Sequence, residues 1–495
     1  MAYVRAVRTA SGATAVQIVW SSRRGAREIE HLGSAHDEAE LAALKAVAAE
    51  RIAAGQQMLE LGLAAAAGAG PLEIVGSAAG HLWEALCRAY DTLGFDKAAG
   101  GDEVFRALVL ARIIEATSKL DSLRVLAETG VAAPSYRTVT RRLPGYAKPL
   151  WRNGLSVACA AHAALGPASL VLYDVSTLYF ETDQGDGFRE PGFSKERRLE
   201  PQITIGLLTD ATGFPLTVEA FEGNKAETAT MLPTLQRFMA AHRLTDITVV
   251  ADAGMLSENN MREIEAAGLG FILGNRIPQI PYVIEQWRKH NPGVEVPDGL
   301  TLTQPWPPGP GSSRREQVIY YQYRADRARR TLAGIDQQIA KAEKAVAGKA
   351  PVKRNRFITL AGGDKFVNRE LEAKTRALAG WKSYITNITA PTPEFVIGAY
   401  HQLWHIEKSF RMSKHDLRAR PIYHHKRESI QAHLAVVFAA LAVTHYIEKQ
   451  TGWSIKKFVQ TARRYRTITI RTGAHVLTAE EPLPTDLRDA LAVIT

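Results

Sequence analysis

The residues 169–277 decide the fold, because they contain five strand-like runs separated by two helical ones. The first three runs are apolar and rich in β-branched residues: SLVLYDVSTLYF at 169–180, QITIGLLTD at 202–210 and PLTVEAFEG at 215–223. Ala211-Thr212-Gly213 joins the last two and predicts a tight hairpin. A helix, the strand DITVVADAG, a second helix and the strand GFILGNR come next. This order predicts an α/β fold with a mixed five-stranded sheet flanked by helices.

The strand pattern stops after this region and resumes at WKSYITNI, residues 381–388. Between them, residues 278–380 hold Pro-rich stretches, a charged helical segment and the basic cluster KRNR at 353–356. Long stretches without a regular pattern are uncommon inside a compact domain. We therefore expect an inserted domain at 278–380 that interrupts the sheet domain.

A long helix is expected after the last strand. Thr392 offers an N-cap hydroxyl, Pro393 suits the first helical position and Glu394 puts an acid in the first turn. The helix is predicted to run to about residue 418, before a proline. At 3.6 residues per turn one face then carries a set of functional side chains: Tyr400, Leu403, Glu407, Arg411 and Lys414.

The part of the chain before the sheet domain is predicted to be mainly helical. Residues 1–35 alternate apolar and polar positions around SSRRG, which predicts a small β-hairpin. Residues 38–55 and 71–130 are rich in Ala and Leu with a helical period. A helix ending near Gly130, a short turn and a basic helix resemble a helix-turn-helix. The candidate DNA-contacting residues on this basic helix are Arg137, Arg141 and Arg142.

These patterns divide the chain into six segments. They are an N-terminal β-hairpin and helix, a helical DNA-binding region of helix-turn-helix type, the first part of the sheet domain, the inserted domain, the second part of the sheet domain with the Glu407 helix, and a basic C-terminal tail. Their ranges are 1–60, 61–166, 167–277, 278–380, 381–450 and 451–495.

Composition excludes several classes of protein. With 46% hydrophobic and 23% charged residues over 495 positions, the chain is globular rather than disordered. Its two cysteines rule out a disulfide framework and a Cys-rich zinc site, and they favour a reducing cytoplasm. The most apolar run, 434–447, is shorter than the roughly 20 residues of a membrane span, so we expect a buried helix and no membrane partner. P-loop, nucleophile-elbow and HExxH motifs are absent from the sequence.

The positive charge is concentrated in one part of the chain. The formal net charge is +10. Residues 401–475 contain 14 Lys and Arg against four acids, which equals the surplus of the whole protein. A concentrated basic segment attracts a polyanion, and nucleic acid is favoured over a membrane surface because no amphipathic anchor accompanies it. A merely solvated basic surface is the alternative.

Three acids stand where chemistry would require them. Asp174 lies in the middle of the first strand, Asp252 at the end of the fourth and Glu407 on the late helix. A carboxylate at a half-buried strand position is costly unless it is paired or binds a metal. The alternatives are solvent-facing or helix-capping aspartates and a surface row of ion pairs around Glu407. His424, His425 and His433 lack the spacing of a metal site, and we expect them on the surface or on a helix face.

The three acids resemble the Asp-Asp-Glu triad of the DDE transposases of bacterial insertion sequences, which have an RNase H-like fold. The helix motif is similar to the Tyr-x2-Arg-x3-Glu-x6-Lys signature of one transposase group, with Leu403 in place of the arginine. Arg411 is a candidate to replace that arginine. An inserted domain between the second Asp and the Glu is usual in this group. Further similar stretches are GFSKERRLEPQ, GLLTDATGFPL, FEGNKAET, VVADAGMLSENN and the TNI before the helix.

The resemblance implies a DNA transposase that binds terminal inverted repeats, cleaves the strands and joins them to target DNA. Asp174, Asp252 and Glu407 would be the catalytic residues and the ligands of Mg²⁺ or Mn²⁺, with two ions expected. Tyr400, Arg411 and Lys414 would hold DNA phosphates. A homodimer or larger synaptic complex on DNA is expected, in the bacterial cytoplasm at the nucleoid. The alternatives are an RNase H-like nuclease without strand transfer and a helix-turn-helix regulator.

Overall fold

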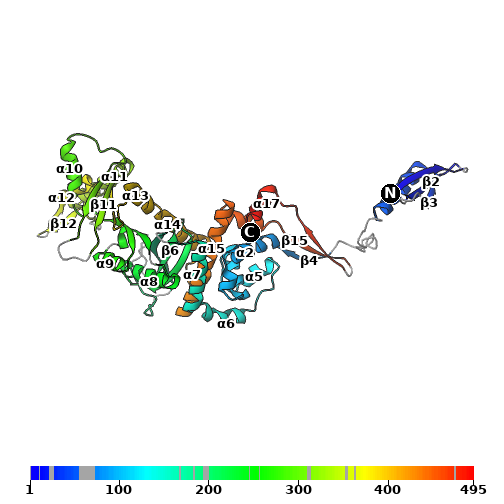
Figure 1. The fold of residues 1–495 in the computed structure, drawn as a ribbon, viewed down its shortest axis with the longest axis horizontal. Helices are drawn as coiled ribbons and strands as arrows, with labels where there is room; N and C mark the ends of the chain where they lie inside the picture. Colours follow the sequence, from blue (N-terminus) through cyan, green and yellow to red (C-terminus); the bar gives the residue numbers. More distant parts are fainter. Residues whose placement is uncertain are drawn as a thin grey trace. The chain divides into compact units, whose positions relative to one another are not determined.

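The protein is described from a computed structural model, whose ribbon Figure 1 shows. It contains two compact units, one formed by residues 1–77 and 467–481 and the other by 78–466 and 482–495. The structure describes residues 2–494 apart from a set of short segments. Those segments are 10–11, 22–26, 55–72, 167–168, 182–183, 193–199, 245, 256, 309–313, 350, 352–354, 362–363 and 473–474.

The larger unit is built on a mixed eight-stranded sheet in the order β10-β11-β14-β9-β8-β5-β6-β7. Strand β5 is its central element: it pairs antiparallel with β6 on one edge and parallel with β8 on the other. The first five strands along the chain lie where the sequence predicts them. Their bounds are Ser169–Tyr179 (β5), Gln202–Asp210 (β6), Pro215–Glu222 (β7), Ile247–Ala251 (β8) and Gly270–Asn275 (β9).

The prediction of a five-stranded sheet is wrong, because three more strands extend it beyond β9. The strand β14 (Trp381–Thr386) pairs antiparallel with β9, and β11 (Gln317–Tyr323) and β10 (Thr301–Trp306) lie further outward. The last two belong to the segment 278–380, which was expected to be an insertion separate from the sheet. Strand β10 contains Pro305, and it pairs with β11 rather than with an element of the predicted sheet. The run QVIYYQY of β11 is rich in strand-forming residues, but its place in the sheet depends on β14, which lies far along the chain.

The two faces of the sheet are covered by different helices. Alternate residues of β5 divide between them. Val171, Tyr173 and Val175 pack with α8 (Met231–His242) and α9 (Glu258–Ala266) in one core. Leu172 and Leu178 belong to a second core, which includes buried residues of α13 (Pro393–His401) and α14 (Leu403–Arg411). Asp174 alternates with the first group, and so it points to the α13–α14 side.

The N-terminal helices of this unit surround one long apolar helix, α15 (Arg427–Thr451). By length and composition α15 is the one described helix that could cross a membrane, yet 89% of its most apolar window is buried inside the protein. It packs against α2, α4, α6 and β7, which confirms the expected buried helix. The helices before β5 are α2 (Gly80–Thr92), α3 (Phe95–Ala98), α4 (Glu103–Ile114), α5 (Ser122–Glu128), α6 (Tyr136–Tyr146) and α7 (Pro149–His162).

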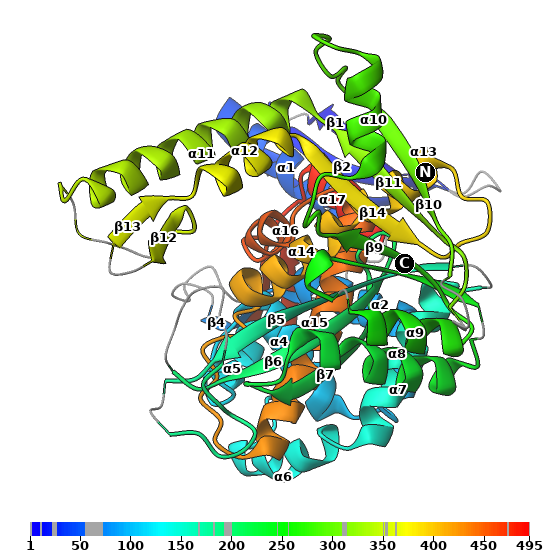
Figure 2. The same cartoon turned by 90° about the vertical axis from the view of Figure 1, so that its left-hand side faces the viewer.

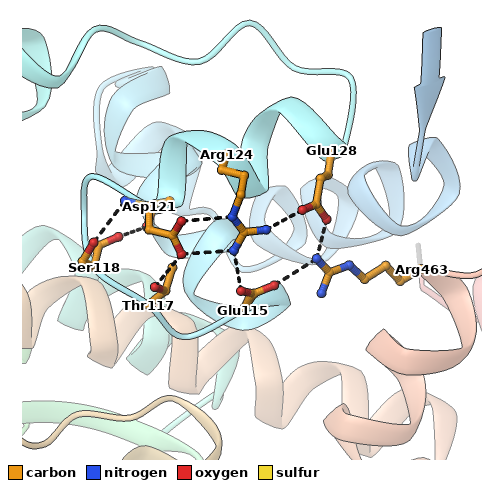
Figure 3. Close-up of polar contacts among 8 residues, drawn as sticks. Glu115, Thr117, Ser118, Asp121, Arg124, Glu128 and Arg463 are labelled. Atoms are coloured by element: carbon orange, nitrogen blue, oxygen red, sulfur yellow. Dashed lines mark hydrogen bonds and ion pairs between the residues drawn. The ribbon is translucent and has the colours of Figure 1, made fainter.

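An ion-pair network joins the C-terminal residues of this unit to α4 and α5 (Figure 3). Arg463, which comes directly after α16 (Ile455–Ala462), pairs with Glu115 at 2.9 Å and with Glu128. Arg124 on α5 pairs with the same two acids and with Asp121. The segment expected as a C-terminal tail therefore holds ordered elements. Besides α16 they are β15 (Thr467–Thr472), β16 (His475–Glu480) and α17 (Thr485–Ala492).

The smaller unit differs from the predicted β-hairpin in having a third strand. Strands β1 (Ala2–Arg8), β2 (Thr14–Ser21) and β3 (Arg27–Ala35) form an antiparallel sheet, with α1 (Glu38–Ala54) packed on it. Most of the expected SSRRG turn lies outside the described residues. A second sheet, in the order β16-β15-β4, contains β4 (Glu73–Ala78), in a stretch that we expected to be helical. The partner of β4 lies almost 400 residues away in the sequence, which local periodicity cannot reveal.

The rest of the segment 278–380 forms a lobe beside the edge of the large sheet. Helix α11 (Ala325–Val346) runs alongside α12 (Arg369–Ala377), with the hairpin β12–β13 against α11 (Figure 2). The strands are Ile358–Ala361 (β12) and Asp364–Val367 (β13), and α10 spans Tyr282–His290. The lobe has a small core of its own, made by Ile335, Ile339, Ala342 and Phe357.

The burial of α15 predicts its contribution to stability. Replacing Leu441, which is buried in this helix, by alanine is expected to lower the free energy of unfolding by about 3 kcal/mol, because it leaves a cavity in the main core. Leu150→Ala is the control, since Leu150 on α7 is 84% exposed and its loss should cost less than about 0.5 kcal/mol. Urea unfolding followed by circular dichroism measures both. Equal midpoints for the two variants would contradict the core position of α15.

Candidate active site

Asp174 and Asp252 occupy matching positions on neighbouring parallel strands. Tyr173 of β5 is paired in register with Ala251 of β8, and each aspartate is the next residue along its strand. Tyr173 and Ala251 both pack in the core on the α8–α9 side. Because side chains alternate along a strand, both aspartates then lie toward the α13–α14 side. The sheet register therefore sets the two carboxylates side by side.

Glu407 reaches the same place from α14, which packs against β5. The three acids line one hollow of about 260 Å³. The other residues that line it are Lys382, Tyr400, His401, Leu403, Trp404 and Ile406. Asp174 is half-buried, whereas Asp252 and Glu407 are exposed. The arrangement thus gathers three carboxylates at a solvent-accessible depression over the middle of the sheet.

Helix α14 is held in place by the turn between β6 and β7. The Ser409 hydroxyl donates a hydrogen bond to the carbonyl oxygen of Gly213 at 2.7 Å. Gly213 has a φ of +88°, and a Cβ there would meet the backbone oxygen of His405 at 2.9 Å. Only glycine allows this close approach, and the approach fixes the helix that carries Glu407.

Tyr400, a candidate phosphate contact from the sequence, is bonded to one of the acids in this structure. Its hydroxyl donates a hydrogen bond to Oδ1 of Asp252. Burial and this carboxylate raise the pKa of Tyr400, so the hydroxyl remains a donor at neutral pH. Asp174 accepts a hydrogen bond from the backbone N–H of Val175 at 2.8 Å. Both aspartates are therefore oriented by neighbouring groups.

Lys382 is a charged residue of the hollow that the sequence analysis missed. It lies on β14, with its Nζ 4.2 Å from the centroid of the Tyr400 ring. Burial lowers the pKa of Lys382, and the carboxylates of Asp252 and Glu407 offset part of that effect. The available signal was a lysine within the otherwise apolar and hydroxyl-bearing strand run WKSYIT. Lys382 and Leu403, which stands in place of the arginine of the signature, both line the hollow.

The helical stretch expected from Thr392 to about Arg418 extends to Asp416, but it is interrupted at Gln402 and its last turn is not α-helical. Its start is confirmed, since Thr392 accepts a hydrogen bond from the N–H of Phe395 at 3.2 Å. The helix then breaks at Gln402, and a π-helical turn covers Met412–Asp416. A π turn adds a residue per turn and rotates the residues after it about the helix axis. Side chains beyond Arg411 therefore leave the face that carries Glu407.

Lys414 consequently lines a second hollow, next to the first along β5. This hollow has a volume of about 470 Å³ and is bordered by Val175, Ser176 and Thr177 of β5. It also contains Lys225, from the FEGNKAET stretch. Arg411 is exposed and is not among the residues lining the acidic hollow. The two cations expected near Glu407 thus lie beside the acids rather than among them.

The three arginines predicted for DNA contact lie on α6. Arg137, Arg141 and Arg142 are all exposed, and Arg142 pairs with Asp102 at 3.2 Å. The Ser135 hydroxyl caps this helix by accepting from the N–H of Thr138 at 3.1 Å. Most of the stretch GFSKERRLEPQ lies outside the described residues, at 193–199.

The donor set of the hollow suits a hard divalent cation, because all three acids offer carboxylate oxygens. Among the residues that the structure describes, no three His, Cys, Asp or Glu side chains form a ready metal-binding group. Like charges repel one another, and Asp252 is turned toward Tyr400. The side chains must therefore rotate before all three acids can bind one ion.

Comparison with family models matches residues 165–443 to the transposase DDE domain. The match covers more than half of the chain, and the protein therefore belongs to this family of transposases. It is a DDE-type transposase enzyme, and enzymes of this type generally use divalent metal ions. Comparison with curated proteins finds no match.

Among solved structures, the chain is similar to a piggyBac transposase, in a cryo-electron microscopy structure of its synaptic complex with hairpin DNA. The sequence identity is 11% and the TM-score 0.39. The alignment covers 77% of this chain and 70% of the piggyBac chain.

The contact between Tyr400 and Asp252 predicts a positioning role. Tyr400→Phe is expected to lower the rate of DNA cleavage by about tenfold, because groups that orient a metal-binding carboxylate contribute that order of activity. Tyr384→Phe is the matched control, since its ring packs on Tyr400 with centroids 4.9 Å apart and its hydroxyl is not bonded to Asp252. Single-turnover cleavage at saturating enzyme measures both. Equal rates in the two variants would remove the positioning role.

Proposed function

We propose that this transposase binds the terminal inverted repeats of an insertion sequence, cleaves the DNA strands there and transfers them into target DNA. The observation that carries the proposal is the gathering of Asp174, Asp252 and Glu407 around one exposed hollow, from two neighbouring strands and a helix. Three carboxylates repel one another, so their gathering from separate elements is unfavourable unless a cation binds between them.

Asp174, Asp252 and Glu407 would hold Mg²⁺ or Mn²⁺, with two ions as the expected number. When bound, such ions activate water or a 3′-hydroxyl and stabilise the leaving oxygen at a scissile phosphate. The residues of the chain divide the remaining work. Tyr400 orients Asp252, and Lys382 balances the negative charge of the hollow. Cleavage and joining then need no covalent bond between DNA and a side chain.

We further propose an RNase H-like core within the large sheet. The five strands β7-β6-β5-β8-β9 support it, since the first three along the chain are antiparallel neighbours and β8 and β9 add in parallel to the other edge of β5. In this arrangement a central strand and its parallel neighbour carry the two aspartates. The segment 278–380 adds β10 and β11 to the outer edge of that core.

The DNA would reach the hollow across a basic surface. Arg411 and Lys414 flank the acids as candidate phosphate ligands, and Arg137, Arg141 and Arg142 on α6 are candidates for binding the repeats. Two DNA ends must be processed together, so a homodimer or larger synaptic complex would form on the DNA. Such an enzyme would work in the bacterial cytoplasm on nucleoid DNA.

Conservative replacement of the acids tests the catalytic proposal. Asp174→Asn and Glu407→Gln are expected to lower Mg²⁺-dependent cleavage of DNA carrying the terminal repeats by about 10³-fold, because each removes a metal ligand worth several kcal/mol at the transition state. Binding to the same DNA should be retained. Glu394→Gln is the matched control, an exposed acid in the first turn of α13 whose removal should leave cleavage unchanged.

Gel analysis of the products decides between the transposase and a nuclease that only cuts. Joined products containing target DNA support strand transfer, whereas cut ends alone favour the nuclease. Unchanged cleavage in Asp174→Asn or Glu407→Gln would exclude the triad.

The salt dependence of DNA binding tests the flanking cations. Arg411→Met together with Lys414→Met is expected to reduce the slope of log K against log salt by about 2, since each phosphate contact contributes about 0.9. Fluorescence anisotropy between 50 and 200 mM salt, as a rough working range, measures the slope. A control pair, Arg329→Met with Arg330→Met, removes two charges from the exposed part of α11 and should leave the slope unchanged. A slope equal to wild type in the first variant would refute both contacts.

A further inference from the structure

A cluster of cationic and imidazole side chains lies away from the acidic hollow, where α4, the loop after it, residues 417–426 and α15 meet. We call Arg112, Lys119, His424 and His433 the buried cation cluster. Arg112 is 8% exposed, Lys119 is 9% exposed and His433 is also buried. The Lys119 amino group contacts Nε2 of His424, and the rings of His424 and His433 have centroids 5.8 Å apart.

The position of His433 is more buried than the surface or helix-face location expected from the sequence. Its Nε2 lies 3.2 Å from the carbonyl oxygen of Ala419, which ties α15 to the preceding loop. Burial lowers the pKa of His433 well below its usual value. The His433 ring is therefore uncharged at neutral pH. The positive charge of the cluster comes from Arg112 and Lys119.

Within the part of the chain that the structure describes, no carboxylate offsets these charges. The charged groups that act on Arg112 and Lys119 are other cations: Arg418 on the first and Arg112 on the second. Burial and this repulsion lower the pKa of Arg112 to about 10 and that of Lys119 to about 7. A buried cation without an anion is unfavourable, because it has lost its hydration and gained no opposite charge.

A nearby arginine that is less buried than Arg112 is paired with acids, which makes the lack of an acid at Arg112 in the described part of the chain informative. Arg124, twelve residues after Arg112, is half-exposed and yet pairs with Glu115, Asp121 and Glu128 (Figure 3). Arg112 is far more buried and has no such partner among the described residues. An unmatched charge at the better-buried position is the signature of a site whose anion comes from outside.

We propose that the buried cation cluster is a binding site for a phosphate group of DNA. Arg112 offers its guanidinium fork and Lys119 its amino group, which are the two side chains that proteins use most for phosphate oxygens. Arg418 is exposed, and it is near enough to Arg112 for its charge to act on that guanidinium. That the phosphate belongs to DNA rests on the proposed function, whereas the anion site itself does not.

The loop around the cluster favours DNA over a small free anion. It adds further basic residues, and two arginines there lie against aromatic rings. The Arg420 guanidinium lies 5.4 Å from the ring of Tyr179, and that of Arg427 lies 4.5 Å from the ring of Phe188. Cation–π contacts hold both guanidinium groups in place beside the loop, and ordered cations on a surface favour a polyanion.

The same loop connects the site to the catalytic strand. The N–H of Ile422 reaches the carbonyl oxygen of Tyr179 at 3.5 Å, at the end of β5 that lies five residues after Asp174. At about 3.3 Å per residue this separation is about 17 Å, which is about five base pairs of DNA. A DNA strand held at the acids would therefore have to follow β5 for only about five base pairs to reach the loop.

Opposite effects on stability and on binding test the proposal. Lys119→Met and Arg112→Met in the full-length protein are expected to keep or raise the melting temperature, since each removes an unpaired buried charge, while weakening duplex binding about tenfold. Arg124→Met is the matched control. It should lower the melting temperature and leave the affinity within about twofold, because the Arg124 charge is already matched by Glu115, Asp121 and Glu128. Anisotropy with repeat-end DNA, in EDTA and at fixed salt, gives the affinities.

Two outcomes would overturn the proposal. One is unchanged affinity in both cluster variants. The other is a loss of affinity that accompanies a fall in melting temperature like that of Arg124→Met, which is the behaviour of a structural cation. Should a cluster variant fail to fold, Lys119→Arg keeps the charge and must retain wild-type affinity, and failure of that rescue also counts against the site.

Wild-type protein separates the two sources of phosphate. Duplex DNA should raise its melting temperature more than inorganic phosphate does at equal ionic strength, and Lys119→Met should abolish that difference. Stabilisation by inorganic phosphate alone would overturn the DNA assignment. Repeating the affinities in the Asp174→Asn background keeps this test apart from catalysis. Suppose that Lys119→Met and Arg112→Met weaken DNA binding but the wild-type protein shows no cleavage. That result would refute the proposed function and still support the anion site.

Discussion

Strand β5 is bonded along both edges, antiparallel to β6 and parallel to β8, and the rest of the larger unit depends on this pairing. A strand buried on both faces must be apolar on both, and β5 satisfies this over residues 170–173 and at Val175 and Leu178. Asp174 interrupts this apolar run between Tyr173 and Val175. The register with β8 leaves no freedom in where that carboxylate lies, because a slip by one residue would turn it into the opposite core. The acidic hollow is thus a consequence of sheet register.

The site is completed by elements that are tied to this strand through specific contacts. Gly213 and Ser409 attach α14 to the β6–β7 turn, and Ile422 attaches the following loop to Tyr179. The negative charge of the three acids lies at the middle of β5, whereas the arginines of the loop after α14 lie near its end at Tyr179. The surplus of +10 in the sequence is therefore spread over several places, some of them buried, and cannot be treated as one basic patch.

Strong local patterns in the sequence were enough to predict the five strands β5 to β9, the N-cap at Thr392 and the three acids on their elements. Features that depend on distant partners were not predictable. Strand β11 joins the sheet through β14, β10 joins it through β11, and β4 pairs with β15, so the place of these strands depends on residues distant in the sequence. The π turn after Arg411 leaves no mark in the periodicity. Lys382 was missed because a lysine in a strand is usually a solvent-facing residue, and only tertiary packing turns it toward the acids.

The sheet β16-β15-β4 sets an order of events during synthesis. Residues 73–78 leave the ribosome early, but their partner strand at 467–472 is made almost 400 residues later. At about 5–20 residues per second this delay is about 20–80 s. By then β5 to β9 and α15 have already been translated. Closure of this small sheet therefore comes after the synthesis of the strands that carry the acids, because it waits for β15.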